Sequence, residues 1–290
     1  MFRYSRHNVM DPNPQAIRNA RAPLTLEQIR TAAPSAFAAQ PFEGMSHRYA
    51  YIPTSEVIRG MMQAGFQPFA ASQSRTSIAE KRAFTKHMVR FRAPMDMSIA
   101  KVGDVFPEVV LVNSHDGSSA YKLMAGLYRL VCTNGLIVAD SMIESVSIKH
   151  TGNVIEAVAT GSIQLVEKMP VCVDAIARWR DIQLSAHEQT AYAQAAHVLR
   201  FADADGTLDT PIQPAQLLRP RRVEDNKADL WSTFNRVQEN VIRGGLRAYR
   251  SGATRRTTSR EVKGINEDVR LNRALWTLTE TLAGLHTASA

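Results

Sequence analysis

Cysteine is scarce in this sequence. Among 290 residues there are only two, Cys132 and Cys172, and both lie in apolar surroundings. Two such thiols make neither a disulfide framework nor a zinc cluster. We therefore expect both to behave as buried structural residues, in a protein that works in a reducing cytoplasm.

Long apolar runs are also missing. No stretch approaches the roughly 18–20 residues that a membrane-spanning helix requires. No apolar segment follows the basic N-terminus, so we expect neither a membrane partner nor a secretory signal.

The motifs that usually carry catalysis or cofactor binding do not occur. There is no phosphate-binding loop and no dinucleotide glycine fingerprint. The eight histidines never fall at metal-ligand spacing. We predict no catalytic residue, no metal site and no cofactor, although an undetected enzyme stays an alternative.

Three segments resemble catalytic or metal sites without meeting their requirements. Residues 113–117 (NSHDG) place Ser, His and Asp side by side, but adjacent side chains diverge, so we interpret a turn. Cys132 with His115 across a hairpin would make a thiol nucleophile, whereas a buried cysteine is the simpler interpretation. Residues 203–209 look like half a calcium loop, but Pro214 stands where the bidentate glutamate belongs.

Charge is present in excess and unevenly placed. The chain has 35 basic and 27 acidic side chains, a net charge of +8. Residues 75–101 hold seven basic and two acidic side chains, residues 102–218 hold seven and thirteen, and residues 219–273 hold fourteen and seven. Two basic blocks around an acidic middle are typical of a polyanion binder, with two solvated faces as the alternative.

Local patterns predict an α+β fold. A helix is expected over residues 51–66, with Thr54 as N-cap and Gly65 at its C-terminal end. Period-two strands follow to about residue 148, with a turn at 115–117. Helical period returns from 154, with a break at 169–170 and a capping box at Ser185 and Glu188. The prediction is a helix, an antiparallel β-sheet and long helices, with a helical basic C-terminal region.

Composition divides the chain into four parts. Residues 1–45 contain five prolines and predict an N-terminal arm, and residues 46–200 form the α+β core. Residues 201–222, rich in Asp and Pro, predict a linker. Residues 223–290 predict two helices around an arginine-rich stretch.

Two sets of basic residues are candidates for nucleic-acid binding. Lys86, Arg90 and Arg92 share one face of a predicted strand near Arg75, and Phe66, Phe69, Phe84 and Phe91 are interleaved, as base stacking beside phosphate contacts requires. A solvated strand face with core aromatics is the alternative. The second set lies in the arginine-rich stretch near the C-terminus and comprises Arg243, Arg247, Arg250, Arg255, Arg256, Arg260 and Lys263. We expect these side chains to neutralise about six phosphates. The alternative is a flexible basic linker with no fixed partner.

Two family resemblances bear on function. Residues 91–92, 107–121 (PEVVLVNSHDGSSAY) and 129–136 (RLVCTNGL), with a C-terminal signature over 221–245, resemble a family of phage and plasmid proteins classed as a domain of unknown function, of the DUF932 type. This resemblance covers about residues 45–285 and implies a mobile-element origin. More distantly, residues 57–92 are similar to single-strand annealing recombinases of the Redβ and Rad-fifty-two type, which form rings or arcs that hold DNA.

We therefore expect a non-enzymatic phage or plasmid protein that binds single-stranded DNA, assembles with itself into a ring or filament, and promotes annealing during recombination. An inhibitor or interaction protein that acts on a host defence component is the alternative hypothesis.

Overall fold

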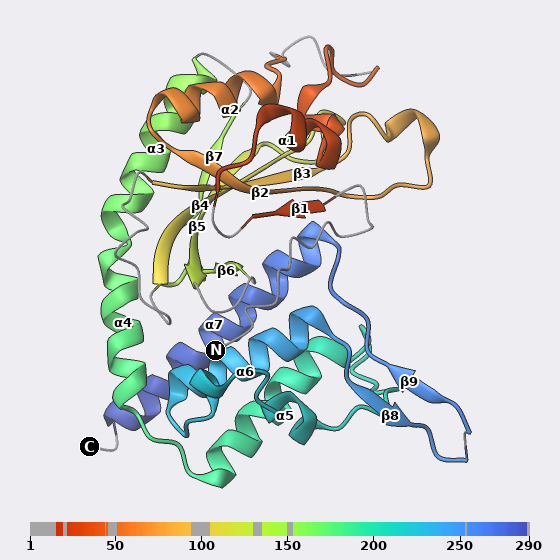
Figure 1. Ribbon diagram of the computed structural model, residues 1–290, viewed down its shortest axis with the longest axis vertical. Helices are drawn as coiled ribbons and strands as arrows, with labels where there is room; N and C mark the ends of the chain where they lie inside the picture. The colour runs from red at the N-terminus through yellow and green to blue at the C-terminus, as the bar shows by residue number, and fades with distance from the viewer. Residues whose placement is uncertain are drawn as a thin grey trace, which may run out of the picture. The chain divides into compact units, whose positions relative to one another are not determined.

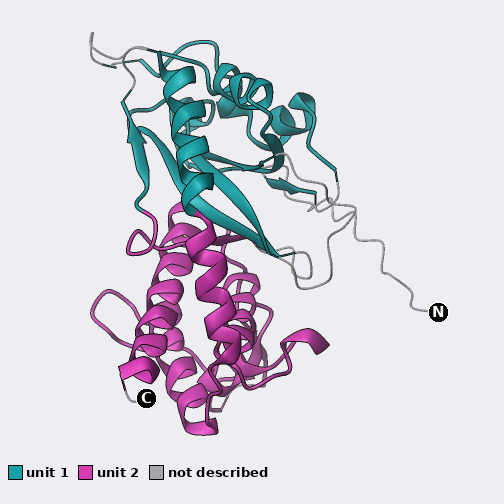
Figure 2. Cartoon of the chain, turned by 90° about the vertical axis from the view of Figure 1, so that its left-hand side faces the viewer, with its two compact units in different colours: residues 1–133, 144–168 teal, residues 134–143, 169–290 magenta. Residues whose placement is uncertain are grey.

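The chain forms two compact units in the computed structural model (Figure 2). Unit 1 consists of residues 1–133 and 144–168, and unit 2 of residues 134–143 and 169–290. The structure describes residues 16–19, 22–43, 45, 51–93, 105–129, 135–149, 153–252 and 254–288.

An antiparallel sheet is the centre of unit 1 (Figure 1). Its strand order is β1-β2-β3-β4-β5, and β7 also pairs with β5. The register places Arg92 of β3 opposite Glu108 of β4. The strands are β1 (Ala16–Arg18), β2 (Gln67–Gln73), β3 (His87–Arg92), β4 (Val105–Asn113), β5 (Tyr121–Arg129) and β7 (Val146–Ile148).

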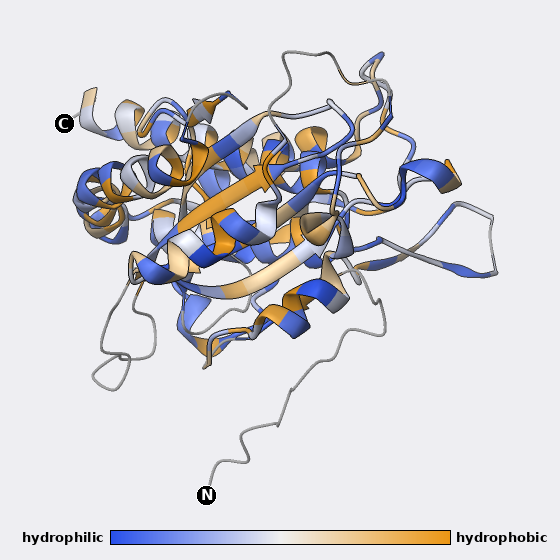
Figure 3. Ribbon diagram, turned by 90° about the horizontal axis from the view of Figure 1, so that it is seen from above, coloured by the Kyte–Doolittle hydropathy of each residue, from blue (hydrophilic) through white to orange (hydrophobic). Residues whose placement is uncertain are grey.

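Helices cover an apolar face of this sheet. Helices α1 (Leu26–Ala32) and α2 (Thr54–Gln63) contact β2, and α3 (Val154–Lys168) contacts β4 and β5. Alternate strand residues on this face are fully buried, and the hydrophobic strand segments stand out in Figure 3; they include Val89, Phe91, Val109, Leu111 and Leu123. The unit also has the 3-10 turns η1 (Pro34–Phe37) and η2 (Ala79–Lys81).

Unit 2 is mainly helical, and an aromatic cluster fills its core. Trp179 lies 4.8 Å from Trp276 between ring centres, and Trp231 stacks on Phe234 at 5.4 Å. These rings come from three of the four helices. The elements are β6 (Gly135–Ile137), α4 (Pro170–Asp181), α5 (Ala186–Phe201), η4 (Pro214–Leu218), η5 (Val223–Asp225), α6 (Leu230–Arg243), β8 (Arg247–Tyr249), β9 (Arg256–Thr258) and α7 (Ile265–Ala288).

The α+β prediction is confirmed, and so are several local signals. A new helix begins at Pro170, and the Ser185 capping box is formed with Glu188. Gly65 and Gly117 have the positive φ angles that their turns need, 92° and 76°. Within the described residues, no helix combines the length and the apolar character needed to cross a membrane.

One detail differs from the sequence-based predictions. Thr54 is the first helical residue of α2, with Pro53 as N-cap, because its hydroxyl points into a buried polar cluster instead of capping the helix. Residues 201–222, the segment predicted as a linker, belong to unit 2, and the chain passes between the units after residues 133, 143 and 168. The backbone of the predicted linker is held by specific contacts, such as the one from His197 Nε2 to the Ile212 carbonyl at 2.7 Å.

Candidate nucleic-acid interface

Arg90 and Arg92 lie on one face of β3, as predicted, but they are buried. They are 1% and 3% exposed, and both reach the carboxylate of Glu108 on the neighbouring strand. Arg90 Nη1 lies 3.3 Å from Glu108 Oε2, and Arg92 Nε lies 3.0 Å from Oε1. The Arg92 guanidinium also lies over the rings of Phe69 and Tyr128, at 3.9 and 3.5 Å. These side chains are engaged inside the protein and are not exposed for contact with DNA.

The remaining predicted residues of unit 1 are accessible. Arg75 follows β2 and is exposed, and Lys86 precedes β3 and is half-buried. The Ser74 amide donates to the Lys86 carbonyl at 2.7 Å, which brings the two segments together. This end of the β2–β3 pair is a small basic surface.

The predicted stacking surface on the sheet is wrong. Phe66, Phe69 and Phe91 are at most 6% exposed, because they belong to the hydrophobic core, and Phe84 is half-buried. None of the first three presents a ring to solvent.

The second basic set forms a β-hairpin that the sequence analysis did not predict. Strands β8 and β9 pair antiparallel and project from the helices of unit 2 (Figure 1). Arg247 lies opposite Thr258, and Tyr249 lies opposite Arg256. Because side chains of a strand alternate between its faces, these four share one face. All four are exposed, whereas the intervening Ala248 and Thr257 are half-buried.

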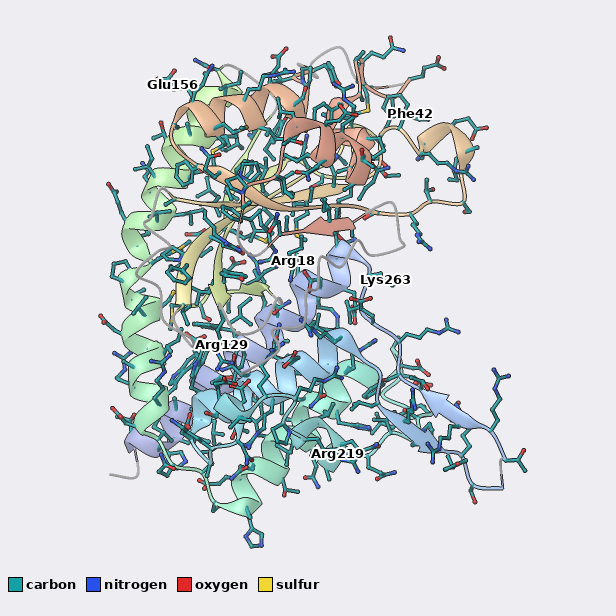
Figure 4. All side chains as sticks on the ribbon, in the orientation of Figure 1. Arg18, Phe42, Arg129, Glu156, Arg219 and Lys263 are labelled. Carbon is teal, nitrogen blue, oxygen red and sulfur yellow. The ribbon has the colours of Figure 1, made fainter. Side chains whose placement is uncertain are left out.

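Most arginines of this basic hairpin, defined as residues 244–263, have no acidic partner. Within the described part of the chain, no carboxylate pairs with the exposed Arg247, Arg255, Arg256 or Arg260. Arg250 does pair with Asp209, at 2.6 Å. Lys263, labelled in Figure 4 where the chain runs from the hairpin into α7, lies 4.0 Å from Glu261. Four exposed arginines of the basic hairpin thus have no carboxylate partner among the described residues.

Glycine fixes the base of the basic hairpin against the end of α6. Gly244 has a φ of 60°, and a β-carbon there would lie 2.6 Å from the backbone carbonyl carbon and oxygen of Arg260. Backbone hydrogen bonds close the base: Gly245 N–H donates to Ser259 O, and Val262 N–H donates to Ile242 O, both at 2.8 Å. No other residue type fits this close approach without displacing the backbone.

Side chains from neighbouring segments hold the sides of the hairpin. Arg200 Nη2 donates to the Arg260 carbonyl at 3.0 Å, and Gln216 Nε2 donates to the Arg247 carbonyl at 2.9 Å. Burial lowers the pKa of Arg200. The hairpin is therefore a supported element and not the flexible linker that was the alternative.

Arg243 differs from the hairpin residues because it is half-buried and ion-paired. Its Nη1 lies 3.1 Å from Glu239 Oε1, an oxygen that Arg222 Nη2 also approaches at 2.9 Å. The neighbouring Arg221 donates from Nε to Asn240 Oδ1 at 2.7 Å and from Nη2 to the Gly244 carbonyl. The C-terminal signature over 221–245 thus forms the support on which the basic hairpin stands.

A buried polar cluster in unit 1 was also missed. Thr54 Oγ1 lies 2.8 Å from His87 Nε2, 3.2 Å from His115 Nε2 and 3.0 Å from Asn113 Nδ2. Burial lowers the pKa of His87 to about 4, so this imidazole is neutral at pH 7. All four residues are at most 1% exposed, so the cluster joins α2 to the sheet and offers no accessible chemistry.

Of the two cysteines the structure describes Cys172, which is buried. Burial raises the pKa of Cys172 to about 12, as expected for a structural cysteine. Cys132 lies outside the described residues. No group of three or more His, Cys, Asp or Glu side chains in the described ranges is placed to hold a metal ion.

Comparison with known proteins gives a family for this fold. Residues 41–276 match the model of the domain of unknown function DUF932. The chain belongs to the DUF932 family. The match spans parts of both units and includes the whole basic hairpin.

Two relatives extend nearly the full length of the chain. UPF0380 protein YfjQ of Escherichia coli strain K12 is 40% identical over 263 residues, which is 90% of this chain and 92% of the relative. UPF0380 protein YafZ of the same strain is 39% identical over 260 residues, with the same coverage. No solved structure matches this DUF932 protein. The similarity to single-strand annealing recombinases therefore stays a prediction.

Proposed function

We propose that this DUF932 protein is a non-enzymatic DNA-binding protein that holds single-stranded DNA on the basic hairpin. The observation that carries the proposal is the set of four exposed arginines without a carboxylate partner in the described chain, on a hairpin whose base is held by Arg200, by Gln216 and by a backbone hydrogen bond to the end of α6. Guanidinium groups donate in a fork that matches phosphate oxygens. A supported hairpin loses little conformational entropy when it binds.

The strength of the interaction follows from counterion release. Each phosphate contact on a single strand lowers the slope of log affinity against log salt by about 0.7. Four contacts predict a slope of about −3 from the hairpin alone. The basic surface of unit 1, with Arg75 and Lys86, is the rival position for the strand.

Annealing and self-association belong to the same proposal. A strand held through its backbone keeps its base edges free to pair with a second strand. Residues 102–218 are acidic and the segments on either side are basic, so copies of the chain offer complementary charges to one another, and repeated head-to-tail contacts of that kind give rings or filaments. Light scattering with oligonucleotide present tests this part, and a single monomer mass would count against it.

The binding test compares two triple variants of equal charge. Fluorescence anisotropy of a labelled oligo-dT is measured over a salt series. The hairpin variant carries Arg247→Ala, Arg255→Ala and Arg260→Ala. The control carries Lys168→Ala, Arg178→Ala and Lys227→Ala, which are exposed residues outside the hairpin.

The hairpin variant is expected to flatten the salt slope by about two units and the control to leave it unchanged. Equal slopes in the wild type and the hairpin variant contradict the proposed site. If Arg75→Ala with Lys86→Ala flattens the slope instead, the strand lies on unit 1. Absence of binding at low salt contradicts the function itself.

A further inference from the structure

The basic hairpin carries one aromatic ring, that of Tyr249, among its arginines. Its residue is 54% exposed, and it is the only aromatic among the large hydrophobic residues that are exposed in the described chain. Burial of aromatic surface is a main source of stability, so a ring of this size in solvent contributes little to the fold. Its position on the arginine face of β8 indicates a binding role.

Arg256 holds this ring in place. It lies directly opposite Tyr249 across the hairpin, and its Nε donates to the Tyr249 hydroxyl at 2.8 Å. Its guanidinium carbon is 5.2 Å from the ring centre, within the range of a cation–π contact. Because the ring is already oriented, binding a second planar group requires little further ordering.

Positive charge lies on both sides of the ring. Arg247 is two residues earlier on the same strand face, about 7 Å along β8. Arg256 lies across the hairpin, so cations flank Tyr249 along the strand and between the strands. An aromatic ring between cations is the arrangement that binds single strands, with a base on the ring and phosphates on the cations.

We infer that Tyr249 stacks on an unpaired base and gives the basic hairpin a preference for single-stranded over duplex DNA. The inference rests on the proposed function and adds the residue that makes the hairpin select a single strand over a duplex. A base inside a duplex presents no free face to Tyr249 unless the helix is unstacked, which costs a few kcal/mol per base. The rival is a hairpin that lies in the major groove of a duplex, where the Tyr249 hydroxyl would contact a phosphate.

The experiment separates stacking from phosphate binding by means of an abasic strand. Affinities are measured by anisotropy for oligo-dT, for an abasic oligonucleotide of equal length and for a duplex. The proteins are the wild type, Tyr249→Phe, Tyr249→Leu and the hairpin triple variant. Because Tyr249 is exposed, far-UV circular dichroism of all variants is expected to match the wild type.

Stacking predicts that the wild type prefers oligo-dT over the abasic strand by roughly 5- to 150-fold, the contribution of one aromatic–base contact. Tyr249→Phe keeps this preference because the ring remains. Tyr249→Leu abolishes it, and the salt slope stays unchanged because the phosphate contacts remain. The hairpin triple variant shows the reverse: a flatter slope with the preference intact.

Other outcomes overturn the inference in distinguishable ways. If Tyr249→Leu binds all three probes as the wild type does, stacking is wrong and the proposed function stands. If the wild type binds the duplex more tightly than oligo-dT and Tyr249→Phe loses this preference, the hairpin lies in the major groove and the Tyr249 hydroxyl contacts a phosphate. If the wild type binds no probe at low salt, both proposals fail.

Discussion

Glu108 is the carboxylate that two buried arginines of unit 1 share. Two guanidinium groups, those of Arg90 and Arg92, contact its two carboxylate oxygens at 3.3 and 3.0 Å, and all three side chains are at most 3% exposed. Replacing Glu108 by Gln keeps the shape of the side chain and removes its charge. Two buried cations then lie side by side without the carboxylate between them.

The cost follows from burial. Removing one partner of a buried ion pair destabilises a protein by about 3–5 kcal/mol, because an uncompensated charge remains. Here one substitution affects two arginines, so Glu108→Gln is expected at the upper end, about 4–5 kcal/mol. That is a large fraction of the roughly 5–15 kcal/mol that stabilises a typical native protein.

A surface pair provides the matched control. Glu27 lies 3.6 Å from Arg30 in the same unit, with side chains 81% and 54% exposed. Glu27→Gln is expected to cost at most about 1 kcal/mol, because exposed pairs and helix-end charges contribute little. Urea unfolding followed by far-UV circular dichroism gives both free energies. If the two variants unfold within about 1 kcal/mol of each other, the argument from buried charge is refuted.

Three further predictions address other parts of the structure. Gly244→Ala is expected to lower thermal stability and oligo-dT affinity more than Gly252→Ala does. Both glycines have a positive φ, but only at Gly244 would a β-carbon contact backbone atoms. Equal effects of the two substitutions would contradict the inference that Gly244 fixes the base of the basic hairpin. Burial lowers the pKa of His87 from 6.5 to about 4, so as the pH falls this histidine binds a proton in the unfolded chain before it does in the folded protein. The free energy of unfolding should therefore fall by about 3 kcal/mol between pH 6.5 and pH 4. If urea unfolding of His87→Asn shows the same loss of stability over this pH range as the wild type, the prediction is wrong. In a Cys132→Ser variant, where Cys172 is the remaining thiol, Cys172 should not react with a thiol reagent at pH 8 until urea unfolds the protein, because burial raises its pKa to about 12. Rapid labelling of the folded protein would contradict a structural role for Cys172.

Local signals in the sequence predicted much of the fold. The start of α4 and the Ser185 capping box depend on residues a few positions apart, and so does the turn at Gly117. Period-two patterning also placed Arg90 and Arg92 on one strand face. These features need no knowledge of distant parts of the chain.

The features that were missed depend on distant contacts. Glu108, sixteen residues beyond Arg92, is the carboxylate that pairs with the buried arginines. Thr54, His87 and His115 come together from three separate elements. Such pairings have no local signature.

The basic hairpin was missed for a different reason. Its strands are only three residues long and contain no hydrophobic run, so the strand-favouring Tyr249, Thr257 and Thr258 were too few to indicate them. A weak signal does exist on either side of Gly252. Arg247 and Tyr249 are separated by one residue, as are Arg256 and Thr258, and this spacing of two is the period of a strand. Its residues were predicted as a basic binding stretch, whereas Tyr249 was not singled out at all.

Ultraviolet cross-linking of an oligo-dT strand, followed by mass spectrometry of the peptides, tests the central claim most directly. The claim is that single-stranded DNA lies on the basic hairpin of unit 2. We predict that cross-linked peptides come mainly from residues 244–263 and include Tyr249, and that cross-linking falls as salt is raised. Cross-links confined to the residues around Arg75 and Lys86, or none under conditions of measured binding, would contradict it.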